Sequence, residues 1–175
     1  IVKLRLSIIG KDKTSSEAKL DYYILELNKL IPDQIYGYGN ATMEGEVGKL
    51  LTAKNQTLST AESCTGGNVS KMLTSISGSS SFFNGGIISY SNQSKSVLLD
   101  IDEKNIDKNG AVSQQVVEQM AANVRLKFNS DFGISTSGIA GPNGGTTEKP
   151  VGTVWIAVAN KDKVISKKLN LGYNR

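Results

Sequence analysis

The hydrophobic and polar positions at the start of the chain predict a small unit with a helix between two strands. Apolar and polar residues alternate over residues 2–9, which predicts a half-exposed strand. A capping box at residues 14–17 then predicts the start of a helix. The stripe expected of an amphipathic helix follows at Leu20, Ile24, Leu27 and Ile31. Residues 35–38 resemble a second short strand, so the pattern predicts a βαβ unit too small to fold alone.

The rest of the chain alternates between the two periodicities. Helical spacing predicts helices over residues 43–54, 68–76 and 114–128, the last with Ser113 as its N-cap. Short apolar or alternating runs predict strands over residues 56–61, 85–91, 132–138, 151–159 and 164–171. Residues 91–95 are interpreted as a loop or turn. Strands interleaved with helices favour an α/β layered domain.

Composition narrows the chemistry that the chain can perform. The 175 residues contain no His and one Cys, which excludes Ser-His-Asp triads, His-ligated metals and internal disulfides. The net charge is only +4, and no stretch of Lys and Arg alternates with aromatic residues, so nucleic-acid binding lacks support. No apolar run is long enough to cross a membrane. The usage of one cysteine favours a reduced, cytoplasmic setting. Because the chain starts at Ile1 and no helix covers its last strand, we expect a fragment of a longer protein.

The segment around Ser63 is the first candidate for chemistry. A predicted strand runs into the polar residues 62–65, then into Gly66 and Gly67, and then into a helix. Such a turn leaves backbone N–H groups free to hold an anion such as a phosphate, and it presents Ser63 as a nucleophile. The alternative is a plain turn in which Thr65 caps the helix and Ser63 is merely exposed. Two further glycine-flanked turns lie at residues 78–81 and 137–145, and the second of these is expected to meet the turn at Ser63 at the carboxyl ends of the strands.

Without His, a lysine is the economical base for a serine nucleophile, because burial lets an ammonium lose its proton near neutral pH. Lys95 and Lys149 are the candidates since both stand beside polar turns, and the alternative for each is a solvated surface lysine. Tyr90 can hydrogen-bond to the same site or pack its ring in the sheet. Glu62 can act as a base, orient a donor, or make a structural hydrogen bond to the turn. Cys64 is interpreted as a small buried residue.

Six motifs, in order along the chain, resemble those of the CinA C-terminal family, the competence/damage-inducible proteins whose members include nicotinamide mononucleotide (NMN) deamidases. They are T-A-E-S-C-T-G-G (60–67), G-S-S-S-F-F (78–83), I-S-Y-S-N-Q-S-K (88–95), G-A-V-S (110–113), S-G-I-A-G-P-N-G-G (137–145) and K-P-V-G-T-V-W (149–155). The resemblance implies a three-layer α/β/α domain over residues 41–175 that lacks the family's last helix. Residues 1–40 more weakly resemble part of the KH-like connecting segment of longer CinA proteins.

The resemblance also implies an activity: hydrolysis of the amide of NMN to nicotinate mononucleotide and ammonia, with no cofactor and no metal. By motif, Ser63 matches the nucleophile and Lys95 the base, while Ser80 and Tyr90 match residues that steady the developing charges. Whether Ser63 or Ser80 attacks is left open by the motifs, and we favour Ser63. The residues that match substrate contacts, chiefly to the phosphate, are Thr65, Gly66, Gly67, Ser137, Gly141, Gly144 and Arg175. The family's closing G-D-R reads Gly-Tyr-Asn-Arg here, which places the register of Arg175 in question.

Two other functions stand beside this one. A CinA-type domain can bind a nucleotide or a protein partner, in a competence or DNA-damage response, without hydrolysing the amide. Single-strand nucleic-acid binding through residues 1–40 is disfavoured because they lack the G-x-x-G clamp of KH modules. A homodimer is expected from the family resemblance alone, and no membrane partner is expected.

Overall fold

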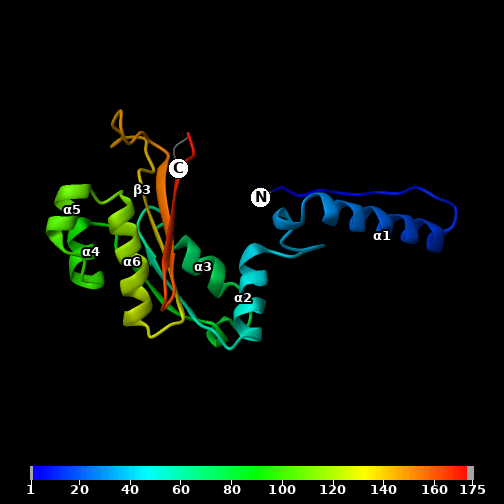
Figure 1. Cartoon of the computed structure of the whole chain (residues 1–175), viewed down its shortest axis with the longest axis horizontal. Coiled ribbons are helices and arrows are strands. Elements are labelled where there is room, and N and C mark those ends of the chain that lie inside the picture. The colour runs from blue at the N-terminus through cyan, green and yellow to red at the C-terminus, as the bar shows by residue number, and fades with distance from the viewer. Residues whose placement is uncertain (1, 173–175) are drawn as a thin grey trace. The chain divides into compact units, whose positions relative to one another are not determined.

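The computed structural model describes residues 2–172, and the chain divides near residue 43 into two compact units. The first unit contains helix α1 (Lys13–Leu30) and the 3-10 turn η1 (Pro32–Gln34), shown in blue in Figure 1. The second unit contains the sheet and the remaining helices. All of the candidate chemistry that the structure describes lies in the second unit.

The two strands predicted in the first unit are wrong. Residues 2–9 and 35–38 are not in strands, so the predicted βαβ unit reduces to a helix with extended flanks. A strand needs a neighbour for its backbone N–H and C=O groups, and the described residues of this unit include no second strand to pair with. The capping prediction also shifts, because α1 begins before Thr14: the carboxylate of Asp12 accepts a hydrogen bond from the Ser15 N–H at 2.6 Å.

The second unit is built on one five-stranded sheet with the order β2-β1-β3-β4-β5. Its strands are β1 (Leu58–Glu62), β2 (Phe83–Ile88), β3 (Phe132–Gly138), β4 (Thr153–Ala159) and β5 (Val164–Asn170). β2, β1 and β3 are mutually parallel, whereas β4 and β5 run antiparallel to their neighbours. The carboxyl ends of β1, β2 and β3 therefore share one edge of the sheet, where open α/β sheets bind their ligands.

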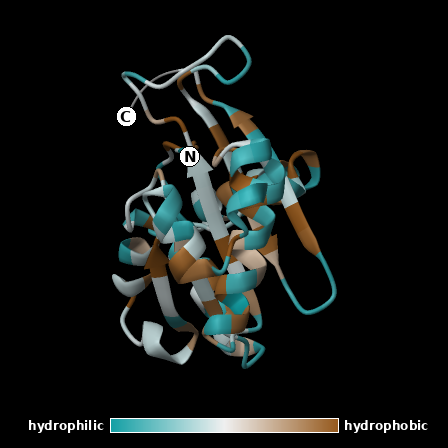
Figure 2. Ribbon diagram, turned by 90° about the vertical axis from the view of Figure 1, so that its left-hand side faces the viewer, coloured by the Kyte–Doolittle hydropathy of each residue, from teal (hydrophilic) through white to brown (hydrophobic). Residues whose placement is uncertain are grey.

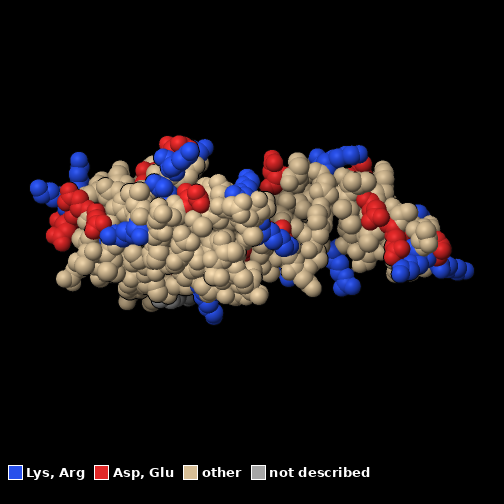
Figure 3. All heavy atoms as spheres, turned by 90° about the horizontal axis from the view of Figure 1, so that it is seen from below, with Lys and Arg blue, Asp and Glu red and all other residues tan. Residues whose placement is uncertain are grey.

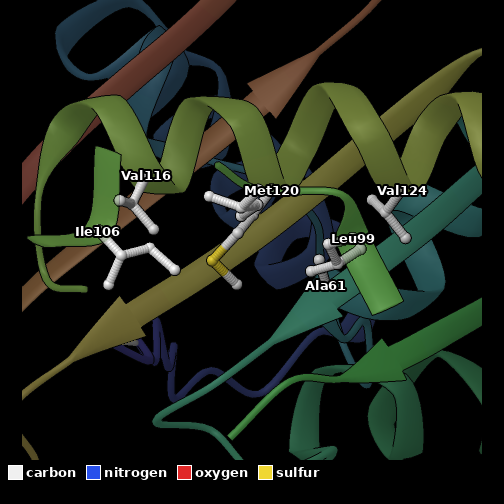
Figure 4. Packing of buried hydrophobic residues seen from close by; sticks show 7 residues of the cluster. Ala61, Leu99, Ile106, Val116, Met120 and Val124 are labelled. Atoms are coloured by element: carbon white, nitrogen blue, oxygen red, sulfur yellow. The ribbon is translucent and has the colours of Figure 1, made fainter. Parts of the chain in front are cut away.

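Helices cover both faces of this sheet. They are α2 (Met43–Ala53), α3 (Asn68–Thr74), α4 (Asn92–Leu99), α5 (Glu103–Asn109) and α6 (Gln114–Lys127), with the 3-10 turn η2 (Ser79–Ser81) before β2. On one face, Ala61 of β1 packs with side chains of α4, α5 and α6 (Figure 4), including Leu99, Ile106, Val116, Met120 and Val124. On the other, Leu58 of β1 packs with Leu51 of α2 and Leu73 of α3. This confirms an α/β fold, with α6 and α3 on opposite sides of the strands in Figure 1.

The sequence pattern located all five strands of the sheet but missed two helices. Strand β3 has the predicted bounds, and Ser113 is the N-cap of α6, as expected. Residues 91–95, interpreted as a loop, instead form the cap and first turn of α4, so that prediction is wrong: the Ser91 hydroxyl accepts the Ser94 N–H at 3.0 Å and starts a helix. α5 was not predicted either, although Asp102 caps it in the same way through the Lys104 N–H.

The helices mix apolar and polar residues, and charged residues are spread over the surface. In Figure 2, hydrophobic and hydrophilic residues alternate along the helices, as expected where one side of a helix faces a sheet. Lys and Arg are interspersed with Asp and Glu on the face that Figure 3 shows. No helix within residues 2–172 combines the length and the hydropathy that a membrane span requires.

Candidate functional site

The turn that follows β1 places Ser63 at the carboxyl edge of the sheet. Ser63 comes directly after the last residue of β1, and its N–H donates to the carbonyl of Thr136 in β3 at 3.0 Å. The chain then turns through Gly66 and Gly67, both with positive φ (60° and 97°), into α3. Glycine adopts these left-handed angles without strain, so the strand can turn sharply into a helix here. Ser63 is consequently held at an elbow by the main chain of two strands.

Lys95 reaches Ser63 from helix α4. Its Nζ lies 3.0 Å from Ser63 Oγ, 2.8 Å from the carbonyl oxygen of Ser89 and 3.4 Å from that of Tyr90. The residue is only 1% exposed, and no ion pair among the described residues includes it. Burial lowers the pKa of Lys95 below the ordinary lysine range, and a smaller electrostatic effect of Cys64 opposes this only in part.

The neighbours of Lys95 suit a neutral amine as well as an ammonium ion. A neutral amine has two N–H donors and one lone pair. The two carbonyls of Ser89 and Tyr90 can take the two donors, and the lone pair then accepts the hydroxyl hydrogen of Ser63. The deprotonated lysine therefore loses no hydrogen bond that the structure shows. This arrangement allows Lys95 to receive a proton from Ser63, the exchange that a Ser–Lys dyad requires.

A cleft of about 230 Å³ opens above the dyad. Its lining includes Ser63 and Lys95 together with Tyr90, Asn92 and Ser137. Ser137, the penultimate residue of β3, donates through its hydroxyl to the carbonyl of Ala111 at 2.8 Å. This bond ties the segment before α6 to the sheet, and Ala111 and Val112 of that segment form the facing wall. The expected convergence of the turns after β1 and β3 is thus confirmed.

The predicted phosphate cradle at the start of α3 is wrong, because a side chain already occupies it. Glu62 Oε2 accepts the N–H groups of Gly67 and Val69 at 3.0 and 3.1 Å, and Oε1 accepts the N–H and hydroxyl of Ser70 at 2.7 Å each. Burial by itself raises the pKa of Glu62, but the hydrogen bonds from Thr65, Ser70 and Val69 outweigh it and hold the pKa below its ordinary value. Of the roles considered for Glu62, the structure supports the structural hydrogen bond to the turn.

Thr65 is also engaged within the protein rather than capping α3. Its hydroxyl lies 2.7 Å from that of Thr136, and the N-cap of α3 is Gly67, which makes no side-chain cap. Thr65, Gly66 and Gly67 do not line the cleft. Cys64 does line it, and burial raises the pKa of its thiol, with a weaker contribution from Glu62 in the same direction. A raised thiol pKa leaves little of the reactive thiolate form of Cys64 at neutral pH.

The structure does not bring Ser80 to this cleft. Ser80 lies in η2, which precedes β2, whereas Ser63 follows β1 at the opposite edge of the sheet. The neighbours of η2 belong to that other edge: the Phe82 carbonyl accepts the Leu58 N–H at the start of β1, and the Ser81 hydroxyl lies 3.3 Å from that of Thr52 in α2. Within one chain, the sequence expectation for Ser80 as a catalytic partner of Ser63 is therefore wrong.

The remaining predicted residues are not part of the lining of the cleft that the structure describes. Gly141 and Gly144 lie in the loop after β3 and do not line the cleft, whereas Gly138 at the end of β3 and Ala140 in the loop do. Arg175 lies outside the described residues. Sequence reasoning missed Asn92, which lines the cleft one helical turn before Lys95. Had residues 91–95 been predicted as a helix, the three-residue spacing would have placed Asn92 beside Lys95.

Lys149, the other candidate base, is excluded by its position. Its Nζ donates to the carbonyl of Asn109 at 2.8 Å and lies against Gly110, outside the cleft that holds Ser63. Lys95 is thus the one of the two candidates that contacts Ser63.

The model of the CinA C-terminal domain family matches residues 40–175. The chain belongs to the CinA family. Two CinA-like proteins, from Cytophaga hutchinsonii and Flavobacterium psychrophilum, are each 45% identical to it over 97% and 99% of this chain. The match covers 41% and 42% of their lengths, so the chain spans about two fifths of these CinA relatives.

Solved CinA structures share the fold of this chain. The competence/damage inducible protein CihA from Agrobacterium tumefaciens is 35% identical, with a TM-score of 0.72 over 74% of this chain and 79% of that one. A CinA superfamily protein from Escherichia coli is 27% identical, with a TM-score of 0.73 over 81% of this chain and 85% of that one. The mixed five-stranded sheet with helices on both faces is thus the architecture shared with solved CinA proteins.

Proposed function

We propose that the chain hydrolyses the amide of nicotinamide mononucleotide to nicotinate mononucleotide and ammonia. The observation that carries this proposal is the contact of 3.0 Å between Ser63 Oγ and the Nζ of Lys95, a buried lysine whose three polar neighbours are all uncharged. Membership of the CinA family, which includes NMN deamidases, supports the choice of substrate. A serine activated by a lysine is a known arrangement for nucleophilic attack on a carbonyl.

In the first half of the reaction, Ser63 Oγ attacks the carbonyl carbon of the amide while Lys95 accepts the hydroxyl proton. The carbonyl oxygen becomes an oxyanion, for which the backbone N–H of Cys64, the residue after the nucleophile, is the donor that an elbow of this kind offers. Tyr90 lines the same cleft and can donate a further hydrogen bond. Lys95 then gives its proton to the nitrogen, the C–N bond breaks, and ammonia leaves behind an ester on Ser63.

In the second half, a water molecule attacks the ester carbonyl while Lys95 takes its proton. The C–O bond to Ser63 breaks, Lys95 returns the proton to Ser63 Oγ, and the carboxylic acid product ionises. The sum is amide plus water giving carboxylate and ammonium, and no external oxidant or cofactor enters the balance. Lys95 is neutral at the start of each half-reaction, which agrees with the direction in which burial moves its pKa.

The deciding experiment measures ammonia release from NMN by the purified protein and by Ser63→Ala. We expect release by the wild type and a loss of about a thousandfold or more in the variant. Cys64→Ser is the matched control, because it changes the neighbouring nucleophile in the same cleft and should retain most of the rate. Ammonia release at the wild-type rate by Ser63→Ala would overturn the proposal. Saturable NMN binding without ammonia release would instead favour a CinA domain that binds nucleotides without hydrolysing them.

A homodimer, which the family resemblance implies, is part of this proposal. Light scattering on the eluting peak of a sizing column distinguishes a mass of 18.7 kDa from twice that value.

A further inference from the structure

A second cleft, of about 310 Å³, lies beside the first and shares Val112 with it. Its lining includes Trp155 and two lysines, Lys149 and Lys168, with Glu148 as the one acidic residue. The first residues of α6, Gln114 and Gln115, also line it. Two lysines and an aromatic ring are features of a site for an anionic group, and here they lie next to the cleft that holds the nucleophile. The chemistry proposed for the Ser63 cleft does not use these three residues.

Residues of the two clefts lie side by side on adjacent strands of the sheet, in one row across β3, β4 and β5. Ser137 of β3 pairs with Trp155 of β4, and Trp155 pairs with Lys168 of β5. Paired residues on adjacent strands point to the same face, here the face that α6 covers, since Trp155 packs against the cluster of Val117 and Ala121. Ser137 lines the first cleft, whereas Trp155 and Lys168 line the second. Two strand spacings separate Ser137 from Lys168, a span of about 10 Å.

We propose that this second cleft binds the phosphate of a mononucleotide whose amide lies at Ser63, with Lys149 and Lys168 as the cations. This inference rests on the proposed function and names where the charged end of that substrate lies. The start of α3 is closed to the phosphate because Glu62 fills it. A substrate that places its amide at Ser63 and extends along the row passes Ser137 and Trp155 and brings its far end to Lys168. The ribose then lies over the boundary that Val112 forms between the clefts.

Lys149 is already oriented for this role. Its Nζ donates to the Asn109 carbonyl at 2.8 Å and is half-buried, so one of its three N–H groups holds the side chain in place while the others remain for a phosphate. Lys168 is exposed on the edge strand. Its neighbour Lys167 pairs with Ile156 and therefore points to the other face of the sheet. The chain thus offers two adjacent lysines of equal charge, of which only Lys168 faces the cleft.

Trp155 is the only tryptophan in the chain, so its fluorescence reports on the second cleft directly and without any need for turnover. The experiment titrates the purified protein with NMN, with nicotinamide riboside, which lacks the phosphate, and with inorganic phosphate. We expect saturable changes in fluorescence with NMN, and at least tenfold weaker binding of nicotinamide riboside. Lys168→Glu and Lys149→Gln should each weaken NMN binding about tenfold or more, while Lys167→Glu should leave it near the wild-type value.

The steady-state readout separates this role from a structural one. If ammonia is released from NMN, Lys168→Glu should raise KM for NMN with little change in kcat, and should leave KM for nicotinamide riboside unchanged. Equal effects of Lys168→Glu and Lys167→Glu, or equal binding of the two ligands with and without phosphate, would overturn the inference. Absence of ammonia release alone would overturn the proposed function and not this one, because the fluorescence titration does not depend on the reaction.

Discussion

Glu62 and Ser63 are neighbours in the chain, yet their side chains contact different helices and do different work. Glu62 Oε1 accepts the hydroxyl and the N–H of Ser70 in α3 at 2.7 Å each, whereas Ser63 Oγ meets the Nζ of Lys95 in α4 at 3.0 Å. Glu62 thus holds the turn after β1 in place, and Ser63 supplies the hydroxyl that contacts Lys95.

Replacement of Lys95 by Met should remove activity and leave the fold intact. Methionine fills a similar buried volume but cannot accept a proton, so ammonia release from NMN should fall by about a hundredfold to ten-thousandfold. Lys71→Met in α3 is the matched control, because Lys71 is exposed and should retain the wild-type rate. Activity of Lys95→Met within tenfold of the wild type would contradict the dyad.

The pH dependence of kcat/KM should follow the protonation of Lys95. Its folded-state pKa lies below the ordinary lysine range because burial disfavours the ammonium ion. The base is therefore inactive below that folded pKa, and kcat/KM should rise with pH as Lys95 deprotonates and level off above it. A rate profile over neutral and alkaline pH checks this. A value of kcat/KM that keeps rising with pH up to the ordinary lysine range before it levels off would show that the base is a solvated lysine.

The protonation of Lys95 should also make the free energy of unfolding depend on pH. Between the lowered folded pKa of Lys95 and its unfolded value, the unfolded chain binds more protons, so the free energy of unfolding of the wild type rises with pH. Below the folded pKa, the buried ammonium opposes folding in full. Lys95→Met lacks this term, so it should be at least as stable as the wild type at neutral pH and should lose that advantage as the pH rises. Denaturant unfolding of both proteins at neutral and alkaline pH measures the difference.

Glu62→Gln should destabilise the protein at neutral pH by about 2 kcal/mol, because the amide replaces one acceptor oxygen with a donor facing N–H groups. The pKa of Glu62 is lowered in the folded state, so its stabilisation is present above the unfolded pKa and is lost as the pH falls through the folded value. The gap between Glu62→Gln and wild type should accordingly narrow in acid. Glu46→Gln is the control: Glu46 forms an exposed surface ion pair with Lys49, and its loss should cost about 0.5 kcal/mol or less.

Gly133→Ala should destabilise the packing of α6 against the sheet. A Cβ at residue 133 would collide with the backbone carbonyl oxygen of Ala121, which cannot move without shifting the helix. We expect a loss of about 2–3 kcal/mol, read as a lower midpoint of thermal unfolding. Gly144→Ala is the comparison, because its Cβ would meet only Ile139 at 4.0 Å and its cost comes from a φ of +90°. A smaller loss for Gly133→Ala than for Gly144→Ala would contradict this account of the close approach.

The sequence predicted the strands of the sheet well because each has a clear apolar run and a partner. It failed for residues 2–9, where alternation of the same kind has no neighbouring strand, since pairing depends on the whole fold and not on the local pattern. The dyad was predicted as a pair of residue types, and the structure supplied what spacing cannot: α4 carries Lys95 back over the end of β1. The role of Glu62 stayed open because a helix start looks equally free in sequence whether or not a carboxylate five residues earlier folds back onto it.

The hairpin that joins β4 to β5 has an influence beyond its own end of the sheet. Its turn closes with the Asn160 N–H donating to the Lys163 carbonyl at 3.0 Å, and this closure fixes the register of β5 against β4. Because alternate residues of a strand face opposite ways, an insertion of one residue there would exchange Lys167 for Lys168 beside Trp155 and turn Ile165 with its neighbours over as well. The length of this turn therefore determines which residues of β5 face the cleft. A change of loop length in this turn would therefore replace Lys168 by Lys167 at the phosphate site that we propose.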